Sequence, residues 1–213
     1  MDTVQPPQLP PFSALRQFVG RKAEGHRCDL CGKALEDHHE HLVEPANRKL
    51  LCACNECTIL LSGRQDGRYR RVPHEVTILD NFRMSDELWQ ALHVPIDLVF
   101  FFTSSQARRV MAFYPSPAGA TESLLSLEAW RDLVRANPIL DSFQPDVEAL
   151  LVYRVGTARA YYRAPIDECY KLVGLIRTHW RGFSGSPRVW QEIGRFFEEL
   201  QERARASGGR ADA

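Results

Sequence analysis

Four cysteines in two closely spaced pairs are the residues of this chain best suited to chemistry. Cys28 and Cys31 form one Cys-x-x-Cys pair, and Cys54 and Cys57 form a second after a polar stretch. Two thiolates on one tight turn supply half of a tetrahedron, so two such turns complete the coordination of a zinc ion without another ligand. The spacing therefore predicts a zinc site with no open position, made by Cys28, Cys31, Cys54 and Cys57.

Two parts of this prediction have alternatives, the identity of the metal and the choice of Cys54 as a ligand. Iron held by four thiolates, as in rubredoxin, also uses two Cys-x-x-Cys-Gly turns, but Thr58 stands where the second turn would have glycine. Cys52 is either a ligand that replaces Cys54 or a small buried apolar residue on the strand that leads to the second pair. Zinc is the predicted cofactor, with iron as the alternative.

The residues after Cys57 decide which kind of finger forms. If Thr58-Ile-Leu-Leu61 continues as a helix, the second pair lies on its first turn, where the positive end of the helix dipole stabilises thiolates. That arrangement is a treble-clef finger. If the same residues form a strand, a zinc-ribbon or rubredoxin-like pair of knuckles results.

A group of histidines between the two cysteine pairs suggests a second chemistry. His38, His39 and His41 lie in Glu36-Asp-His-His-Glu-His-Leu-Val-Glu-Pro45, and a histidine in the loop of a treble-clef finger is the general base of HNH-type nucleases. No later histidine or asparagine is suitably placed to hold a divalent metal beside His41. The simpler expectation is a solvated loop, with His41 packed on the finger or serving as a substitute metal ligand.

Composition excludes several classes of protein. The 27 basic and 27 acidic side chains cancel, whereas proteins whose main partner is a polyanion carry a basic excess, so nucleic acid is not expected as a partner. No membrane span and no secretory signal is visible. We therefore expect a cytoplasmic protein, in which reduced thiols bind metal rather than form disulfides.

The pattern of apolar residues predicts an α+β fold, in which an antiparallel sheet is covered on one face by helices. Helices are expected after Ser85, after Ser126, from Pro165 and from Pro187, and the loop 115–121 is not expected to form regular structure. Cys169 is expected to be a small buried residue rather than a nucleophile. The strands are expected at 96–103, 107–114, 147–155 and 158–163.

The chain divides by composition into four parts. Residues 1–12 form a proline-rich tail that is expected to be disordered, and 13–73 form the metal-binding finger module. The α+β domain follows over 74–206, and 207–213 form a second disordered tail.

Several stretches together with the finger resemble an uncharacterised bacterial protein family. They are 95–102, 114–122, 145–151, 165–177 and Trp180-Arg-Gly-Phe-Ser-Gly185. Members of that family are often encoded beside nickel-iron uptake hydrogenases of the high-affinity kind. The resemblance implies an accessory role in hydrogenase assembly or function and supplies no catalytic residues.

These observations predict a metal-binding accessory protein that is not an enzyme. The finger is expected to be structural and to present a surface to a protein partner, which by resemblance is a hydrogenase subunit or maturation factor. Two other classes remain as alternatives, a rubredoxin-like iron electron carrier and an HNH-like nuclease.

Overall fold

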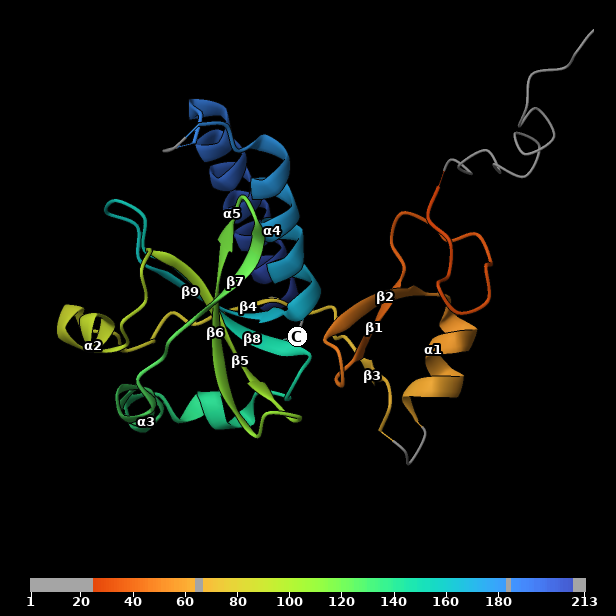
Figure 1. Ribbon diagram of the computed structural model, residues 1–213, viewed down its shortest axis with the longest axis horizontal. Helices are drawn as coiled ribbons and strands as arrows, with labels where there is room; N and C mark the ends of the chain where they lie inside the picture. The colour runs from red at the N-terminus through yellow and green to blue at the C-terminus, as the bar shows by residue number, and fades with distance from the viewer. Residues whose placement is uncertain (1–24, 64–66, 183–184, 209–213) are drawn as a thin grey trace, which may run out of the picture.

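A computed structural model of the 213-residue chain describes residues 25–63, 67–182 and 185–208. It contains a three-stranded sheet in the finger and a six-stranded sheet in the rest of the chain (Figure 1). The predicted tail 1–12 and the last five residues of the predicted tail 207–213 lie outside the described residues. The boundaries at 73 and 206 stay predictions.

The finger consists of a knuckle, a hairpin and a short helix. The knuckle is closed by a bridge between Arg27 and Ala34. β1 (Glu40–Glu44) pairs antiparallel with β2 (Lys49–Ala53) and, at its other edge, with β3 (Arg70–Arg71). α1 (Asn55–Ser62) follows β2 directly. Since a helix and not a strand follows the second cysteine pair, the treble-clef alternative is the one found.

The six-stranded sheet is antiparallel throughout, with the order β4-β9-β8-β5-β6-β7. Its strands are β4 (Thr77–Ile78), β5 (Leu98–Ser104), β6 (Arg109–Ser116), β7 (Gly119–Ser123), β8 (Glu148–Tyr153) and β9 (Ala160–Pro165). The predicted α+β class and the antiparallel pairing are therefore confirmed.

Helices cover both faces of this sheet, not one face as expected. α4 (Ile166–His179) and α5 (Pro187–Gly208) pack on one face, and α2 (Asp86–Ala91), α3 (Leu127–Ala136) and the 3-10 helix η2 (Pro138–Ser142) pack on the other. The reason lies in β5, where Leu98 and Phe100 join the first core and Phe101 joins the second. A strand that is apolar on both of its faces requires cover on both sides.

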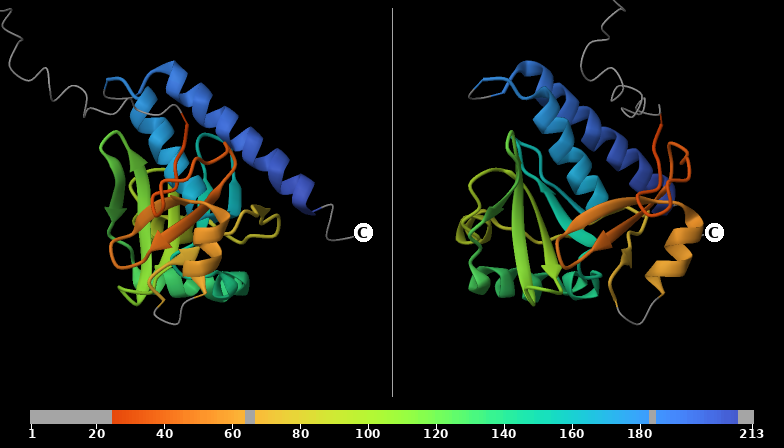
Figure 2. Two further views of the ribbon diagram at one scale, coloured as in Figure 1. Left: turned by 90° about the vertical axis from the view of Figure 1, so that its right-hand side faces the viewer. Right: turned by 45° about the vertical axis from the view of Figure 1, so that its right-hand side comes forward.

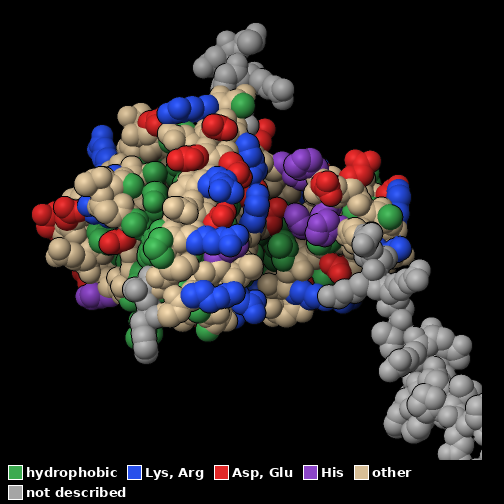
Figure 3. Space-filling model, turned by 90° about the horizontal axis from the view of Figure 1, so that it is seen from above, with side chains coloured by type: hydrophobic (Ala, Val, Ile, Leu, Met, Phe, Trp, Pro, Cys, Tyr) green, Lys and Arg blue, Asp and Glu red, His purple; other side chains and the backbone are tan. Residues whose placement is uncertain are grey.

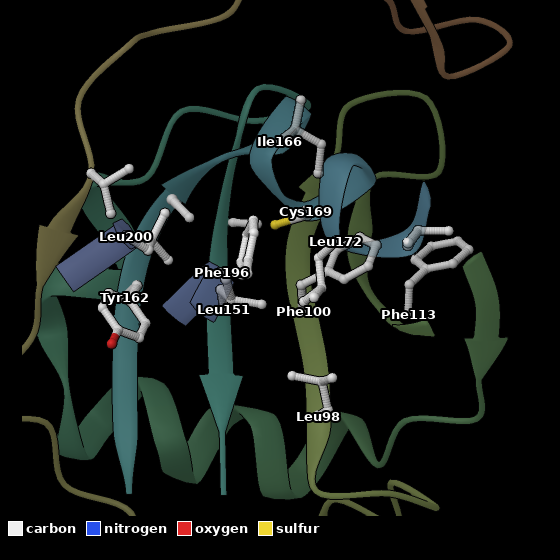
Figure 4. Close-up of a cluster of buried hydrophobic side chains, with 14 of the residues drawn as sticks. Leu98, Phe100, Phe113, Leu151, Tyr162, Ile166, Cys169, Leu172, Phe196 and Leu200 are labelled. Atoms are coloured by element: carbon white, nitrogen blue, oxygen red, sulfur yellow. The ribbon is translucent and has the colours of Figure 1, made fainter. Parts of the chain in front are cut away.

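The larger core lies between the sheet and the helices α4 and α5 (Figure 4). Phe100 and Leu151 face it from adjacent central strands, while Leu172 and Phe196 come from the two helices. Cys169 is fully buried among them, as expected of a small apolar residue. Burial raises the pKa of its thiol well above the usual value, which favours the neutral thiol over the nucleophilic thiolate.

The segment 115–121 forms regular structure, contrary to expectation. β6 continues through Pro115 to Ser116, and β7 returns along it with Pro115 opposite Ala120. Proline is tolerated there because β5 pairs with β6 only as far as Phe113. Gly119, with φ of +126°, supplies the turn conformation that other residues rarely adopt.

The four helices begin where they were predicted to begin, except that α4 starts one residue later than expected, with Pro165 as its N-cap. The side chains of Ser85 and Ser126 accept hydrogen bonds from the first turns of α2 and α3, and α4 and α5 begin at Ile166 and Pro187. Among the described residues, no helix has both the length and the apolar character needed to cross a membrane.

The finger is fixed against the larger domain at the end of the sheet where α4 begins (Figure 2). Val43 of β1 and Val72, which follows β3, belong to the same buried cluster as the core of the α+β domain. The Nε atom of Arg70 lies 3.2 Å from Oδ2 of Asp146, which is almost fully buried. The finger and the domain therefore share apolar and ionic contacts.

Candidate metal centres

The four predicted cysteine ligands lie together in the finger. The sulfurs of Cys28, Cys31, Cys54 and Cys57 all lie within 4.8 Å of one another, and those of Cys31 and Cys54 are 3.7 Å apart. A tetrahedral ion with zinc–sulfur bonds of about 2.3 Å places its sulfurs about 3.8 Å apart. The donor set and its spacing therefore fit one tetrahedral metal ion.

Backbone hydrogen bonds place the first pair on a tight knuckle. The amide of Gly32 donates to the carbonyl of Cys28, and the amide of Cys28 donates to the carbonyl of Lys33, each over 2.8 Å. Gly32 has φ of +77°, a conformation that costs little only for glycine. Gly32 therefore closes the knuckle.

The second pair belongs to the beginning of α1. Cys54 is the N-cap residue, and its sulfur accepts a hydrogen bond of 3.5 Å from the amide of Cys57. Both sulfurs therefore lie at the positive end of the helix dipole, which stabilises thiolates. Lys33 of the knuckle and Glu56 of α1 form an ion pair of 2.5 Å that joins the two halves of the site.

The pKa values of the cysteines indicate how a bound cation would affect this cluster. Burial opposes ionisation of Cys28, but hydrogen bonds from the amides of Cys54, Leu30 and Cys31 lower its pKa to about 6. Burial and the neighbouring cysteine sulfurs raise the pKa of Cys57 to about 12. The cluster alone cannot hold four negative charges at neutral pH, whereas a bound divalent cation would allow all four thiols to ionise.

Cys52 does not replace Cys54 among these four. It lies on β2 opposite His41, half-buried rather than in the core, and its sulfur is grouped with ring nitrogens of His26 and His39. The Sγ of Cys52 and one nitrogen of each ring all lie within 4.8 Å of one another. The expectation that Cys52 is a buried apolar residue is therefore only partly met.

The three predicted loop histidines have different surroundings. His38 is exposed, as expected of a solvated loop, whereas His39 and His41 are half-buried. The Nδ1 atom of His41 lies 2.9 Å from Oδ2 of Asp167 on the first turn of α4. His41 therefore joins the finger to the domain, and it does not take part in the four-cysteine cluster.

A hollow of about 1280 Å³ lies where the finger meets α4 and α5. Its finger side is lined by residues between 26 and 56 together with His74, and its other side by Asp167, Tyr170 and Lys171 of α4 and Glu199 of α5. Figure 3 shows histidine side chains gathered in this part of the surface. Sequence reasoning missed His26 and Asp167 because neither belongs to the histidine group 38–41.

Fold and site together define an α+β protein with a four-cysteine treble-clef finger fixed to its larger domain. The chain belongs to the Family of unknown function (DUF5947), which matches residues 27–204. This agrees with the uncharacterised family expected from the sequence. No curated protein and no solved structure matches the chain.

Proposed function

We propose that the protein is a non-catalytic, metal-binding accessory protein whose finger is held by one structural zinc ion and presents a surface to a protein partner. The observation that carries the proposal is the clustering of four cysteine sulfurs within 4.8 Å. Four protein ligands leave no position for substrate or water, which is typical of structural zinc sites.

The small core of the finger supports a structural role for the metal. Its separate buried cluster consists of Leu42, Leu51 and Ala53, with three partly buried neighbours. A segment with so little apolar burial does not fold by itself, and zinc binding supplies folding free energy directly.

The exposed side of α1 supports a role in protein binding. Ile59 and Leu60 are adjacent on this helix and are 66% and 71% exposed, while Leu61 packs on the finger core. Neighbouring exposed apolar side chains on a rigid helix are typical of a contact surface. By the family resemblance, the partner is a cytoplasmic subunit or maturation factor of a nickel-iron hydrogenase.

The metal is tested by elemental analysis of protein that is purified without a nickel resin and dialysed against a chelator. We expect about one retained zinc per chain and no visible colour, since zinc has no absorption of its own. One retained iron with thiolate charge-transfer bands would replace this proposal with the electron carrier.

The binding surface is tested with purified hydrogenase subunits and maturation factors from the same organism. Leu60→Glu is expected to weaken binding of one of them at least ten-fold. Leu124→Glu is the matched control, because Leu124 lies in the α+β domain, outside the finger, and is 93% exposed. Equal binding by both variants, or no binding by the wild type, would contradict the proposal.

A further inference from the structure

We propose that His26, His39 and Cys52 form a second metal site, which binds a divalent transition metal ion such as Zn²⁺ and keeps at least one coordination position open. The site is separate from the four-cysteine cluster and goes beyond the structural role proposed above. Its three donor atoms lie within 4.8 Å of one another. Two imidazole nitrogens and one thiolate are ligands that zinc, copper and nickel accept.

His39 has the hydrogen bonding of a metal ligand. Its Nδ1 atom lies 2.8 Å from the carbonyl oxygen of Glu36, and since a carbonyl can only accept, Nδ1 carries the proton. In the neutral ring, Nε2 then carries the lone pair. This Nε2 atom is buried and has no hydrogen-bond partner. Buried polar atoms are rarely left unpaired, and metal-bound histidines usually donate their other ring N–H to an acceptor such as a backbone carbonyl.

In the folded finger, backbone hydrogen bonds hold the three ligands in place without an ion at this second site. The amide of Cys52 donates to Oδ2 of Asp29 over 2.7 Å, and the amide of Asp29 donates to the carbonyl of Cys52 over 2.8 Å. The carbonyl of His26 accepts from the amide of Leu35. His39 immediately precedes Glu40, whose partner across the hairpin is Ala53, next to Cys52. In the folded finger, the knuckle and the hairpin therefore bring the ligands together before the second ion binds.

The position of the site indicates an exchangeable ion rather than a structural one. His26, His39 and Cys52 all line the hollow between the finger and α4, and His26 is exposed. Three protein ligands leave a fourth position for water or for a donor from another molecule, unlike a closed four-cysteine site. The ring of His41 lies edge-on to that of His39 at 4.8 Å between centroids, so it also borders the site.

The test uses tag-free, chelator-treated protein that retains its structural zinc. Titration with Co²⁺, followed by calorimetry and absorption, should show about one further ion per chain with a thiolate-to-cobalt charge-transfer band. His39→Ala and Cys52→Ser should each weaken this binding about 10- to 100-fold, and Cys52→Ser should remove the band. His38→Ala is the matched control, because His38 is an exposed neighbour outside the group, and it should bind as the wild type does.

Structural zinc content and thermal unfolding of every variant separate this proposal from the previous one. They should be unchanged in Cys52→Ser and His39→Ala if the second site is independent. The proposal is overturned if the wild type binds no second ion, if Cys52→Ser keeps the charge-transfer band, or if Cys52→Ser loses the structural zinc. The last result would make Cys52 a ligand of the finger instead.

Discussion

The α+β domain and the finger differ in how much apolar surface they bury. The domain has a sheet buried on both faces, with central residues such as Phe100 and Leu151 fully inaccessible. Among its described residues, the finger has a separate buried cluster of only Leu42, Leu51 and Ala53, beside four cysteines that could hold a metal ion. We expect apolar burial to be sufficient for the first, and the second to depend on metal and on contact with its neighbour. The comparison predicts that the two regions respond to different perturbations.

Removal of the metal should produce the largest difference in stability between the finger and the α+β domain. Zinc sites of this kind contribute about 10–16 kcal/mol of apparent binding free energy at pH 7, which the finger would lose. We expect Cys28→Ser, or a strong chelator, to abolish hydrogen-exchange protection in β1, β2 and α1 while β5 and β8 stay protected. Cys169→Ser is not a suitable control because Cys169 is buried, so Ser62→Ala, on the last turn of α1, serves instead. Retained protection of the finger without metal would contradict the comparison.

Truncation of a side chain in the domain core should destabilise the α+β domain and leave the zinc content of the finger unchanged. Leu151 is fully buried on β8, and Leu151→Ala is expected to lower the free energy of unfolding by about 2–5 kcal/mol because it leaves a cavity. Leu124→Ala, at a 93% exposed position, should change it by less than about 0.5 kcal/mol. Urea unfolding measures both variants, and elemental analysis should find the zinc content of each unchanged. Loss of zinc from Leu151→Ala would mean that the finger cannot keep its metal without an intact domain core.

Features that depend on local sequence patterns could be predicted, both in the finger and in the domain. Cysteine spacing predicted which four sulfurs cluster, because ligands on two short turns depend on local geometry. The strands β5 and β8 followed from their apolar runs. The cover on both faces could have been predicted from Leu98–Phe102. Alternate residues of a strand point to opposite faces of the sheet, and in this run the residues on both faces are apolar.

Other features depend on tertiary contacts that no local pattern reports. β7 has the sequence Gly-Ala-Thr-Glu-Ser, which is poor in strand-forming residues, and its structure comes from pairing with β6. Asp167 is 126 residues from its partner His41. His26 and Cys52 belong to different elements, and only the folded knuckle places them beside His39.

A pair of glycine substitutions should distinguish backbone geometry in the finger from that in the domain. A methyl group added at Gly32 or at Gly174 meets no atom within 4 Å, but only Gly32 has positive φ, at +77°. Gly32→Ala should therefore destabilise the finger by about 1–2 kcal/mol through backbone strain. Gly174→Ala lies inside α4 and should stabilise the domain by up to about 1 kcal/mol. Competition with a chelator measures the effect of Gly32→Ala, and urea unfolding measures that of Gly174→Ala. If both substitutions stabilised their regions, backbone strain at the knuckle would be unimportant.

The contact between His41 and Asp167 should have the smallest effect, and it tests how far the two regions depend on each other. Their side chains are 24% and 17% exposed, so the hydrogen bond is partly protected from water. A double-mutant cycle with His41→Ala and Asp167→Ala should give a coupling of about 0.5–1.5 kcal/mol, measured from hydrogen exchange of the β1 amides in the metal-loaded protein. The pair of Arg109 and Glu122, which lies wholly within the domain and is 46% and 40% exposed, is the control and should couple more weakly. A coupling near zero for His41 and Asp167 would mean that the other contacts, namely those of Val43 and Val72 and the ion pair of Arg70 with Asp146, hold the finger in place.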